Sequence, residues 1–378
     1  MKIQISKEKL LKALTIADSI ISSKNINALL FNCLFNVKKN EIEIISNNTE
    51  TITYTTLEAS SDQENSFTVN GKKMATILRE FPDDQVVIEV NESMILDLKS
   101  QSEKLKGNYK LIGTLADDYP EIEKFVEDNL IKLEQSFLKK IINKVIYAAS
   151  LDSIKPAYNG VCLKIDPQGN LTAVSTDSKR MAFYTTTIEN PLKEKHEIII
   201  PLKTISQIAA LLNKGEVFLS FDKKRFFVQI DETKIISRIV DESFPNYKSI
   251  LESKILFKTK IEKEDLLSAL KRVMIFTKEP TYRVTLIFKG ENLTIKAKTP
   301  EIGEAQEELQ IQSLHKEELS LQLNAYYLTE ALKRIETSAL ECSLTGINTP
   351  LLITPFKDSQ PQKDELVVIM PFKFEELD

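Results

Sequence analysis

The sequence predicts an α+β fold made of three repeated domains, each with two helices packed on antiparallel sheets. Two helical patterns recur at an even spacing along the 378 residues. They occupy 6–14 and 71–81, then 133–141 and 202–212, then 262–270 and 325–335. Internal repeats at a fixed period decide an architecture before any single residue does. Three repeats of roughly 125 residues each have the usual size of a domain, and each can bury its own core.

Apolar residues in the first helix of the repeats follow helical spacing. Leu10, Leu14 and Ala17 recur on one face of the first copy, at the i, i+4 and i+7 positions. Ser6 precedes this face and predicts an N-cap, because its hydroxyl can accept a hydrogen bond from a free amide of the first turn. Leu266 continues the same pattern in the third repeat, 129 residues after Phe137 of the second.

Short segments of alternating apolar and polar residues lie between the helices and predict strands. Turn residues such as those of 167–170 and 290–292 separate them. Examples of these predicted strands are 33–37, 41–45, 51–56, 85–90, 161–165, 216–221, 226–230, 284–288 and 293–298. Runs of strands with only two helices per repeat favour antiparallel sheets.

Aromatic-proline pairs mark equivalent points near the ends of two repeats. Tyr119-Pro120 and Phe244-Pro245 are 125 residues apart, and each follows acidic residues. The segments just beyond them are candidate linkers between domains. We therefore expect domains at 1–122, 129–251 and 255–378.

Composition indicates a protein of the reducing cytoplasm. The N-terminal segment lacks the features of a secretory signal, and no apolar run approaches the roughly 18 residues of a membrane span, so no membrane partner is expected. Cys33, Cys162 and Cys342 give neither a disulfide framework nor the paired spacing of a metal site. Cys33 and Cys162 are 129 residues apart, which predicts one buried strand position in two repeats.

Motifs of catalysis are missing from the sequence, so we expect no enzyme activity and no cofactor. The nine glycines form no phosphate-binding or nucleophile-elbow motif, and His196 and His315 have no histidine partner at ligand spacing. Asp83-Asp84 and Asp117-Asp118 could hold Mg²⁺ in a metal-dependent nuclease. Both pairs lie beside prolines in turn-like segments, where aspartate is common for backbone reasons, so this hypothesis ranks last.

Lysine and arginine recur on all the predicted helices although the net charge is −5. Such residues are usually a solvated helix face. The alternative is that the helices turn a basic face toward a polyanion and contact its phosphates without base readout. Candidate phosphate contacts are Lys12, Lys140, Lys203 and Lys271. If the lysines are only solvated, the three repeats form a protein-interaction scaffold instead.

Several segments, in this order and at this spacing, resemble the bacterial sliding clamp family, the β subunit of DNA polymerase III. They are 171–184, 198–212, 237–251, 321–332 and 367–372. The resemblance covers essentially the whole chain. It implies three DNA-clamp domains per chain and a head-to-tail dimeric ring that encircles duplex DNA independently of sequence. Such a ring tethers the replicative polymerase for processive synthesis.

The resemblance also implies one pocket per chain for short peptide motifs of the polymerase III catalytic subunit, the clamp loader and other clamp-motif proteins. Its apolar walls would receive Leu and Phe anchors, and Arg180 and Asn324 would offer orienting hydrogen bonds. The matching positions are Thr176, Arg180, Met181, Pro245, Ile250, Tyr282, Asn324, Tyr327, Val368, Ile369, Met370, Pro371 and Phe372. Ser178, Lys179 and Ser249 depart from the family pattern at the pocket rim, and an acidic tail follows Lys373.

A dimer contact between the first domain of one chain and the third domain of the other is also implied. Lys73, Tyr109 and Leu111 would meet Ile275, Phe276, Glu301 and Glu304 of the partner through edge strands. Ile275 and Phe276 could equally be a helix end buried in their own domain. Lys24 lies in a segment where the family touches DNA, which adds it to the candidate DNA contacts.

Overall fold

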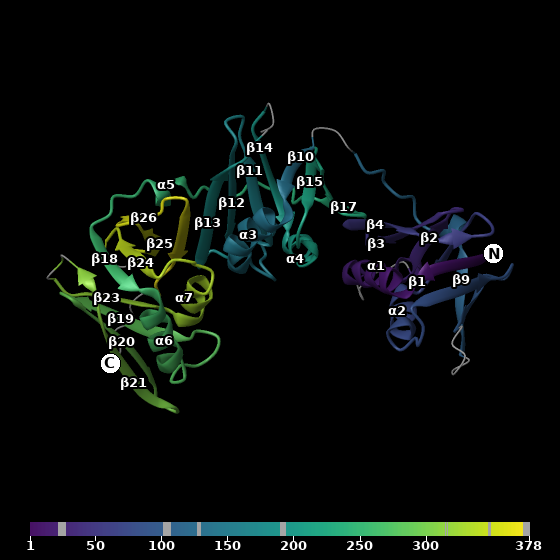
Figure 1. Cartoon of the computed structure of the whole chain (residues 1–378). Helices are drawn as coiled ribbons and strands as arrows, with labels where there is room; N and C mark the ends of the chain where they lie inside the picture. Colours follow the sequence, from purple (N-terminus) through teal and green to yellow (C-terminus); the bar gives the residue numbers. More distant parts are fainter. Residues whose placement is uncertain are drawn as a thin grey trace. The chain divides into compact units, whose positions relative to one another are not determined.

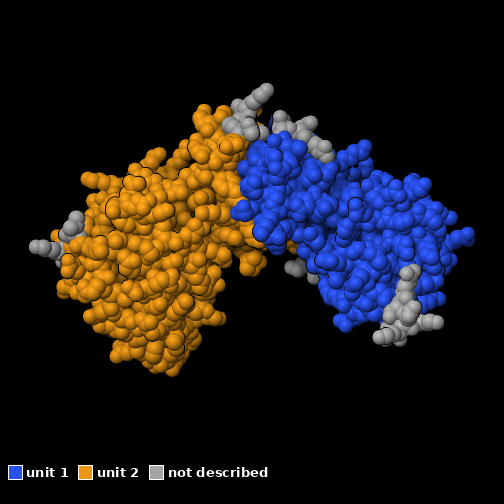
Figure 2. Space-filling model, viewed as in Figure 1, with its two compact units in different colours: residues 1–136, 210–239 blue, residues 137–209, 240–378 orange. Residues whose placement is uncertain are grey.

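The chain divides into two compact units, which share the second repeat between them. The computed structural model describes residues 1–21, 28–100, 107–126, 130–189, 194–313, 315, 317–346 and 349–372. Unit 1 consists of residues 1–136 and 210–239, and unit 2 of residues 137–209 and 240–378 (Figure 2). Each unit has its own sheets and its own packed helices.

The helices of unit 1 begin at caps that the sequence supplies. In α1 (Lys7–Ile20), the Ser6 hydroxyl accepts a hydrogen bond of 3.4 Å from the Lys9 amide, which confirms the predicted N-cap. In α2 (Gly71–Arg79), the Asn70 side chain accepts from the Lys73 amide at 2.9 Å. The two helices pack together, and their buried apolar faces belong to one core with the strands of the first repeat (Figure 1).

One antiparallel sheet of 13 strands runs through unit 1. Its order is β10 (Ile131–Glu134), β15 (Glu216–Phe221), β16 (Arg225–Ile230), β17 (Thr233–Arg238), β4 (Thr51–Glu58), β3 (Glu41–Asn47), β2 (Cys33–Val37), β6 (Asn65–Val69), β9 (Asn108–Leu115), β8 (Ile95–Lys99), β7 (Gln85–Val90), β1 (Lys2–Ser6) and β5 (Ser60–Ser61). β17 pairs with β4, with Ile235 opposite Thr53. This pairing joins half of the second repeat to the first repeat.

Unit 2 repeats this arrangement in a ten-stranded sheet. Its order is β14 (His196–Pro201), β11 (Gly160–Ile165), β12 (Asn170–Thr176), β13 (Arg180–Thr187), β27 (Glu365–Ile369), β25 (Leu351–Lys357), β24 (Ala339–Leu344), β18 (Phe257–Glu262) and β22 (Gln312–Ser313), with β26 (Gln360–Pro361) beside β25. A further sheet has the order β21 (Gly303–Gln310), β20 (Asn292–Thr299), β19 (Arg283–Lys289) and β23 (Leu319–Asn324). Because β13 pairs with β27, the second and third repeats are continuous here.

The remaining helices complete the repeat that the sequence predicts. α3 (Gln135–Val145) and α4 (Leu202–Leu211) belong to the second repeat, and α6 (Lys263–Met274) packs on α7 (Ala325–Leu332) in the third (Figure 1). All six expected helices and all nine expected strands are confirmed within a few residues. The sequence missed α5 (Lys248–Leu251), a single turn, and four short 3-10 helices: 28–31, 116–118, 146–148 and 156–158.

The three cysteines are buried, and burial raises the pKa of each thiol to about 12. Cys33 on β2 and Cys162 on β11 occupy equivalent core positions, as their spacing predicts. A thiol so rarely ionised is a packing residue and a poor nucleophile.

Two kinds of feature are absent from the part of the chain that the structure describes. No helix there combines the length and the apolar character needed to cross a membrane. No three His, Cys, Asp or Glu side chains there converge as metal ligands, and the aspartate pairs 83–84 and 117–118 belong to no such group.

Candidate functional site

A small pocket in unit 2 lies where the second repeat meets the third. Its volume is about 100 Å³. The antiparallel pairing of β13 with β27 forms its base, because Met181 lies opposite Val368 in the register. The lining residues are Tyr158, Thr176, Ser178, Arg180, Met181, Phe244, Pro245, Asn246, Tyr247, Ile250, Val368 and Met370. Seven of the thirteen positions implied by the resemblance therefore line one cavity.

Apolar side chains of different burial shape the walls of this pocket. Met181 and Val368 are buried, whereas Met370 keeps 43% of its surface exposed. The Met370 amide donates to the Lys179 carbonyl at 2.8 Å, so the segment after β27 is held against the turn after β12. An exposed apolar side chain that is fixed in this way is available to a ligand at little entropic cost.

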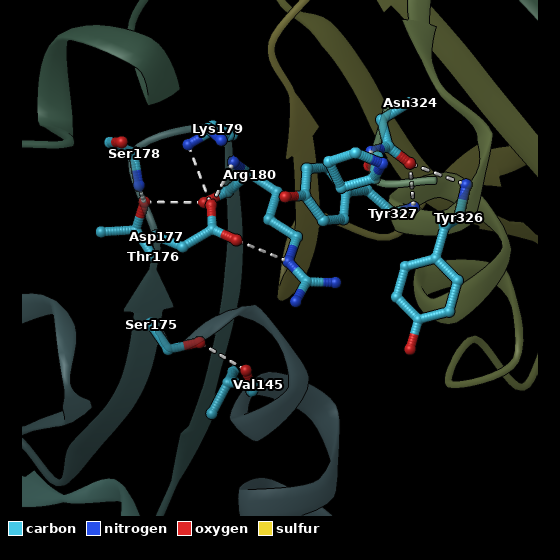
Figure 3. Close-up of polar contacts among 11 residues, drawn as sticks. Val145, Ser175, Thr176, Asp177, Ser178, Lys179, Arg180, Asn324, Tyr326 and Tyr327 are labelled. Carbon is cyan, nitrogen blue, oxygen red and sulfur yellow. Dashed lines mark hydrogen bonds and ion pairs between the residues drawn. The ribbon is translucent and has the colours of Figure 1, made fainter. Parts of the chain in front are cut away.

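The turn between β12 and β13 is organised by Asp177 (Figure 3). Its Oδ1 accepts from the amides of Lys179 and Arg180, both at 2.9 Å, and its Oδ2 accepts from Arg180 Nε at 3.0 Å. Ser178 has a φ of 74°, in the left-handed region where a non-glycine residue is uncommon. The turn therefore fixes the direction in which Arg180 leaves the strand.

The Arg180 guanidinium lies between two aromatic rings. Its carbon Cζ is 4.4 Å from the Tyr327 ring centroid and 5.7 Å from that of Tyr147. Arg180 Nη1 and the Tyr147 hydroxyl are buried and have no hydrogen-bond partner among the described residues. Burial also raises the pKa of Tyr147, so its hydroxyl stays protonated. Buried donors without partners can orient the polar groups of a ligand.

Asn324 has a structural task beside the pocket. Its Oδ1 accepts from the amides of Tyr326 and Tyr327 at 2.9 and 3.2 Å, which caps α7 (Figure 3). Its Nδ2 donates to the Pro280 carbonyl at 3.2 Å. The side chain is nearly buried, and these bonds use both of its ends. It positions Tyr327 beside Arg180, and the direct hydrogen bond to a peptide that the resemblance implies stays a prediction.

The predicted pocket positions near the C-terminus differ in which face of β27 their side chains take. Val368 faces the pocket, and the next residue, Ile369, is fully buried in the core of the third repeat. Neighbouring side chains of a strand point to opposite faces, so both cannot line the same cavity. Phe372 lies outside the pocket, where its amide donates to the Gln322 carbonyl at 2.8 Å and Arg283 Cζ is 4.8 Å from its ring centroid. Pro371 connects Met370 to this anchor.

Sequence reasoning missed four lining residues, Tyr158, Phe244, Asn246 and Tyr247, whereas it had named Ser178 at the pocket rim. Three of them flank Pro245, which marks the end of the second repeat, so proximity to that mark is a usable signal. The rings of Phe244 and Tyr247 are 6.1 Å apart at a steep angle. Tyr282 lies beyond the cavity, and its ring stacks on Tyr326 at 5.5 Å.

The helix lysines differ in their surroundings. Lys12 on α1 is exposed and lines a groove of about 760 Å³ whose acidic lining residues are Glu8, Glu41, Glu43, Glu58, Asp231 and Glu232. Lys140 on α3 pairs with Glu336 at 2.8 Å. Lys203 on α4 and Lys271 on α6 are exposed. Lys24 lies outside the described residues.

Three of the positions implied in a dimer contact lie on two partly open edge strands, Tyr109 and Leu111 on β9 and Glu304 on β21. Residues 108–112 of β9 pair with β8, and the described residues give them no strand on the other side. β21 likewise pairs with β20 alone within the described chain. Ile112 is 82% exposed, whereas its neighbour Leu111 is buried and Tyr109 packs on Phe81.

The other half of the implied contact is beside β21. Ile275 is 69% exposed, and Phe276 packs partly into the core of the third repeat. Lys73 is exposed on α2. Glu301 and Glu304 are exposed and pair with Lys278 and Lys298 at 2.9 and 3.8 Å.

Family models of the DNA polymerase III beta subunit match the chain in order. The N-terminal domain matches residues 1–123, the central domain 132–246 and the C-terminal domain 248–372. The chain belongs to the DNA polymerase III beta subunit family.

Relatives of this family member are named "Beta sliding clamp". One from Halalkalibacterium halodurans is 26% identical over 304 residues, 79% of each chain. Another, from Pseudomonas aeruginosa, is 24% identical over 385 residues and covers 99% of this chain and 100% of the relative. The similarity therefore extends from end to end.

Solved structures agree with the fold of this family member. The crystal structure of the DNA polymerase III subunit beta from Pseudomonas aeruginosa is similar at a TM-score of 0.91 and 25% identity, over 99% of this chain and 100% of that one. The DNA polymerase sliding clamp from Bacillus subtilis has a TM-score of 0.92 at 21% identity, with the same coverage. A further structure is that of a sliding clamp from Pseudomonas aeruginosa bound to griselimycin, at a TM-score of 0.89 and 25% identity over the same shares of both chains.

Proposed function

We propose that this chain is a DNA sliding clamp, a non-catalytic processivity subunit that tethers the replicative polymerase to duplex DNA in the cytoplasm. The observation that carries the proposal is the match of three beta-subunit domains, in order, over nearly the whole chain. The fold agreement with a solved beta subunit over 99% of the chain supports it. The domain boundaries 1–122, 129–251 and 255–378 are part of this proposal.

Processivity in such a ring comes from topology and needs little affinity. The chain is acidic overall, with a net charge of −5, and has exposed lysines on its helices. Weak phosphate contacts that release counterions let a protein slide, because no contact reads a base. We propose that Lys12, Lys24, Lys140, Lys203 and Lys271 supply these contacts.

A head-to-tail homodimer is the second part of the proposal. It would pair the open edge of β9 in one chain with the open edge of β21 in the other. Exposed Ile112 and Ile275 supply apolar surface near these edges, and the carboxylates of Glu301 and Glu304 can complement Lys73 across the contact. Pairing two edges also protects both from unspecific strand addition. Tyr109, Leu111 and Phe276 would support this contact from within their own domains.

The pocket at Arg180 is the proposed binding site for partner peptides. Its apolar walls suit Leu and Phe anchors, and the buried, unpartnered Nη1 of Arg180 suits a backbone or side-chain oxygen. The proposed partners are the polymerase III catalytic subunit, the clamp loader and other proteins with a clamp-binding motif. Thr176, Met181, Pro245, Ile250, Val368 and Met370 would contact the peptide together with Arg180. Asn324 and Tyr327 would position that arginine.

A peptide-binding scaffold that never encircles DNA is the second candidate. The pairing of Lys140 with Glu336, and the acidic groove around Lys12, favour it because both reduce the positive charge offered to a phosphate. Joint charge reversal of Lys12, Lys140 and Lys271 separates the two candidates. Unchanged retention on DNA would favour the scaffold.

Retention on nicked circular DNA tests the clamp directly. The chain is loaded with a bacterial clamp loader and ATP, washed at high salt, and followed before and after the circle is linearised. A clamp stays on the closed circle and is lost when an end is cut, because only topology holds it. If salt governs the loss and cutting changes nothing, the contact is electrostatic and the clamp proposal fails.

A further inference from the structure

A row of aromatic rings leads from the pocket onto the surface of the third repeat. Tyr327, 4.4 Å from the Arg180 guanidinium, is 6.4 Å from Tyr326 between ring centroids. Tyr326 in turn stacks on Tyr282 at 5.5 Å with an interplanar angle of 26°. Figure 3 shows Tyr327 beside Arg180 and Tyr326 farther from it, both at the start of α7. The row is therefore continuous with the pocket.

Backbone hydrogen bonds hold the outer pair of rings in place. The Ala325 amide donates to the Tyr282 carbonyl at 2.9 Å, and Asn324 ties the Pro280 carbonyl to the cap of α7. Tyr282 has a φ of 42°, a left-handed conformation that a bulky residue rarely adopts. Tyr326 nevertheless leaves 42% of its surface exposed. A fixed aromatic pair with an open face is prepared for a ligand.

The charge at the outer end of this row is negative. The Tyr282 hydroxyl donates a hydrogen bond to the carboxylate of Glu279, which is exposed. The nearby cations are directed elsewhere: Lys278 pairs with Glu301 at 2.9 Å, and Arg283 lies over the Phe372 ring. Electron-rich ring faces and a carboxylate attract a cation and repel a phosphate.

We propose that Tyr282, Tyr326 and Glu279 form a subsite for a basic side chain, arginine above all, in the segment that flanks the pocket-binding motif of a partner peptide. The inference rests on the proposed peptide-binding function of the pocket. An extended chain advances roughly 3.3 Å per residue, so this side chain lies about three to five residues from the one beside Arg180. Arginine suits the subsite because its planar guanidinium stacks on a ring while it pairs with a carboxylate.

Stacked tyrosines also bind the bases of single-stranded nucleic acid. Here the carboxylate of Glu279 accepts from the Tyr282 hydroxyl and would repel a backbone phosphate, which favours the peptide. The nucleic acid is therefore an outcome that the experiment must separate.

The test measures how much a flanking arginine adds to peptide binding. The probe is a fluorescent peptide with Leu and Phe anchors, selected by display on the wild-type chain, that carries arginine or neutral citrulline three to five residues outside the anchors. We expect arginine to lower Kd about 3- to 10-fold relative to citrulline, as an exposed cation–π contact with a charge partner does. Tyr326→Ala and Glu279→Gln should each reduce this ratio below about 2, because each removes a group that attracts the arginine charge. The matched control Glu318→Gln, an exposed carboxylate paired with Lys289, should leave the ratio unchanged.

The outcomes separate this inference from the pocket itself. If both peptides bind equally, and Met370→Ala weakens both, the pocket holds and the subsite is wrong. If the display selection yields no binding peptide, or if Met370→Ala leaves the binding of both peptides unchanged, the proposed peptide site fails and the subsite fails with it. If an oligo-dT strand binds in a Tyr326-dependent way while arginine adds nothing, the row is a platform for nucleic acid and the inference is overturned.

Discussion

The side-chain nitrogen of Lys144 on α3 lies 2.9 Å from a carboxylate oxygen of Glu365 on β27, and the two side chains are only 5% and 9% exposed. Lys144 also donates to the Arg334 carbonyl at 2.8 Å, and Glu336 lies 3.7 Å away. The pair therefore ties a helix of the second repeat to the strand that leads into the pocket wall. Desolvating two charges is costly, and the surrounding hydrogen bonds must offset that cost.

Removing one partner should leave an uncompensated buried charge. We expect Lys144→Met to lower the free energy of unfolding of unit 2 by about 3–5 kcal/mol. The double variant Lys144→Met with Glu365→Gln should recover much of this loss, because no lone charge remains. Urea unfolding of the intact chain, followed by circular dichroism, measures both. The matched control is Lys38→Met, whose exposed pair with Glu41 is worth about 0–1 kcal/mol. Equal losses in the two single variants would contradict the buried pair.

The Glu365 carboxyl also makes the free energy of unfolding depend on pH. Burial, the largest influence, raises the pKa of Glu365 above the ordinary value of 4.5, and Lys144 opposes this rise. The ordinary pKa applies to the unfolded chain and the raised pKa to the native state. At a pH between the two, the native state holds a proton that the unfolded chain has released. The free energy of unfolding therefore falls as pH increases through this interval. Glu365→Gln should therefore flatten the change in urea midpoint from about pH 4.5 upward.

The exposed Glu58 serves as a control, because its pKa is shifted in the opposite direction. The hydrogen bond from Lys9 lowers the pKa of Glu58, so its contribution is present above the ordinary pKa and is lost as pH falls. Glu58→Gln should leave the pH dependence of the urea midpoint above pH 4.5 unchanged. If the urea midpoint of the wild-type chain rises with pH above 4.5, relative to that of Glu365→Gln, the pKa of Glu365 is not raised and the prediction is wrong.

Lys144 also indicates where sequence reasoning reaches its limit. On the sequence it is one of several helix lysines, and a solvated face is the usual explanation. Its partner Glu365 is 221 residues away, so no local pattern reveals that this lysine is buried. The helices and strands were predictable because apolar periodicity is local, and Leu10 or Leu266 shows it within a few residues.

The strand pairing that connects the repeats was equally unpredictable from the sequence. The pairing of β17 with β4 places Ile235 opposite Thr53, and neither strand signals which neighbour it will find. The pocket positions came from the resemblance, which identified Met181 and Val368 but could not separate Val368 from buried Ile369. That distinction depends on which sheet face a side chain takes, and a one-residue change of register reverses it.

Met370 is the pocket residue best suited to a binding test. It is exposed while its backbone is held by Lys179, so truncation should cost contact area with little effect on folding. We expect Met370→Ala to weaken peptide binding by about 1–2 kcal/mol, a 5- to 30-fold rise in Kd. Fluorescence anisotropy with the anchored peptide measures it. Leu256→Ala, an exposed leucine outside the pocket, should change Kd less than about twofold. A loss of similar size in both variants would count against this pocket.

The proposed dimer predicts a pattern that only a head-to-tail contact produces. Ile112→Lys and Ile275→Lys each place a charge into both contacts of the ring, and each should shift the chain to monomer in sedimentation velocity. Ile154→Lys, at a fully exposed position elsewhere, should stay dimeric. Mixing the first two variants should restore a dimer, because one of its two contacts then joins an unaltered first domain to an unaltered third domain. In the alternative dimer, Ile112 of one chain meets Ile112 of the other, and Ile275→Lys would not affect it. A dimer that survives Ile275→Lys would therefore exclude the head-to-tail ring.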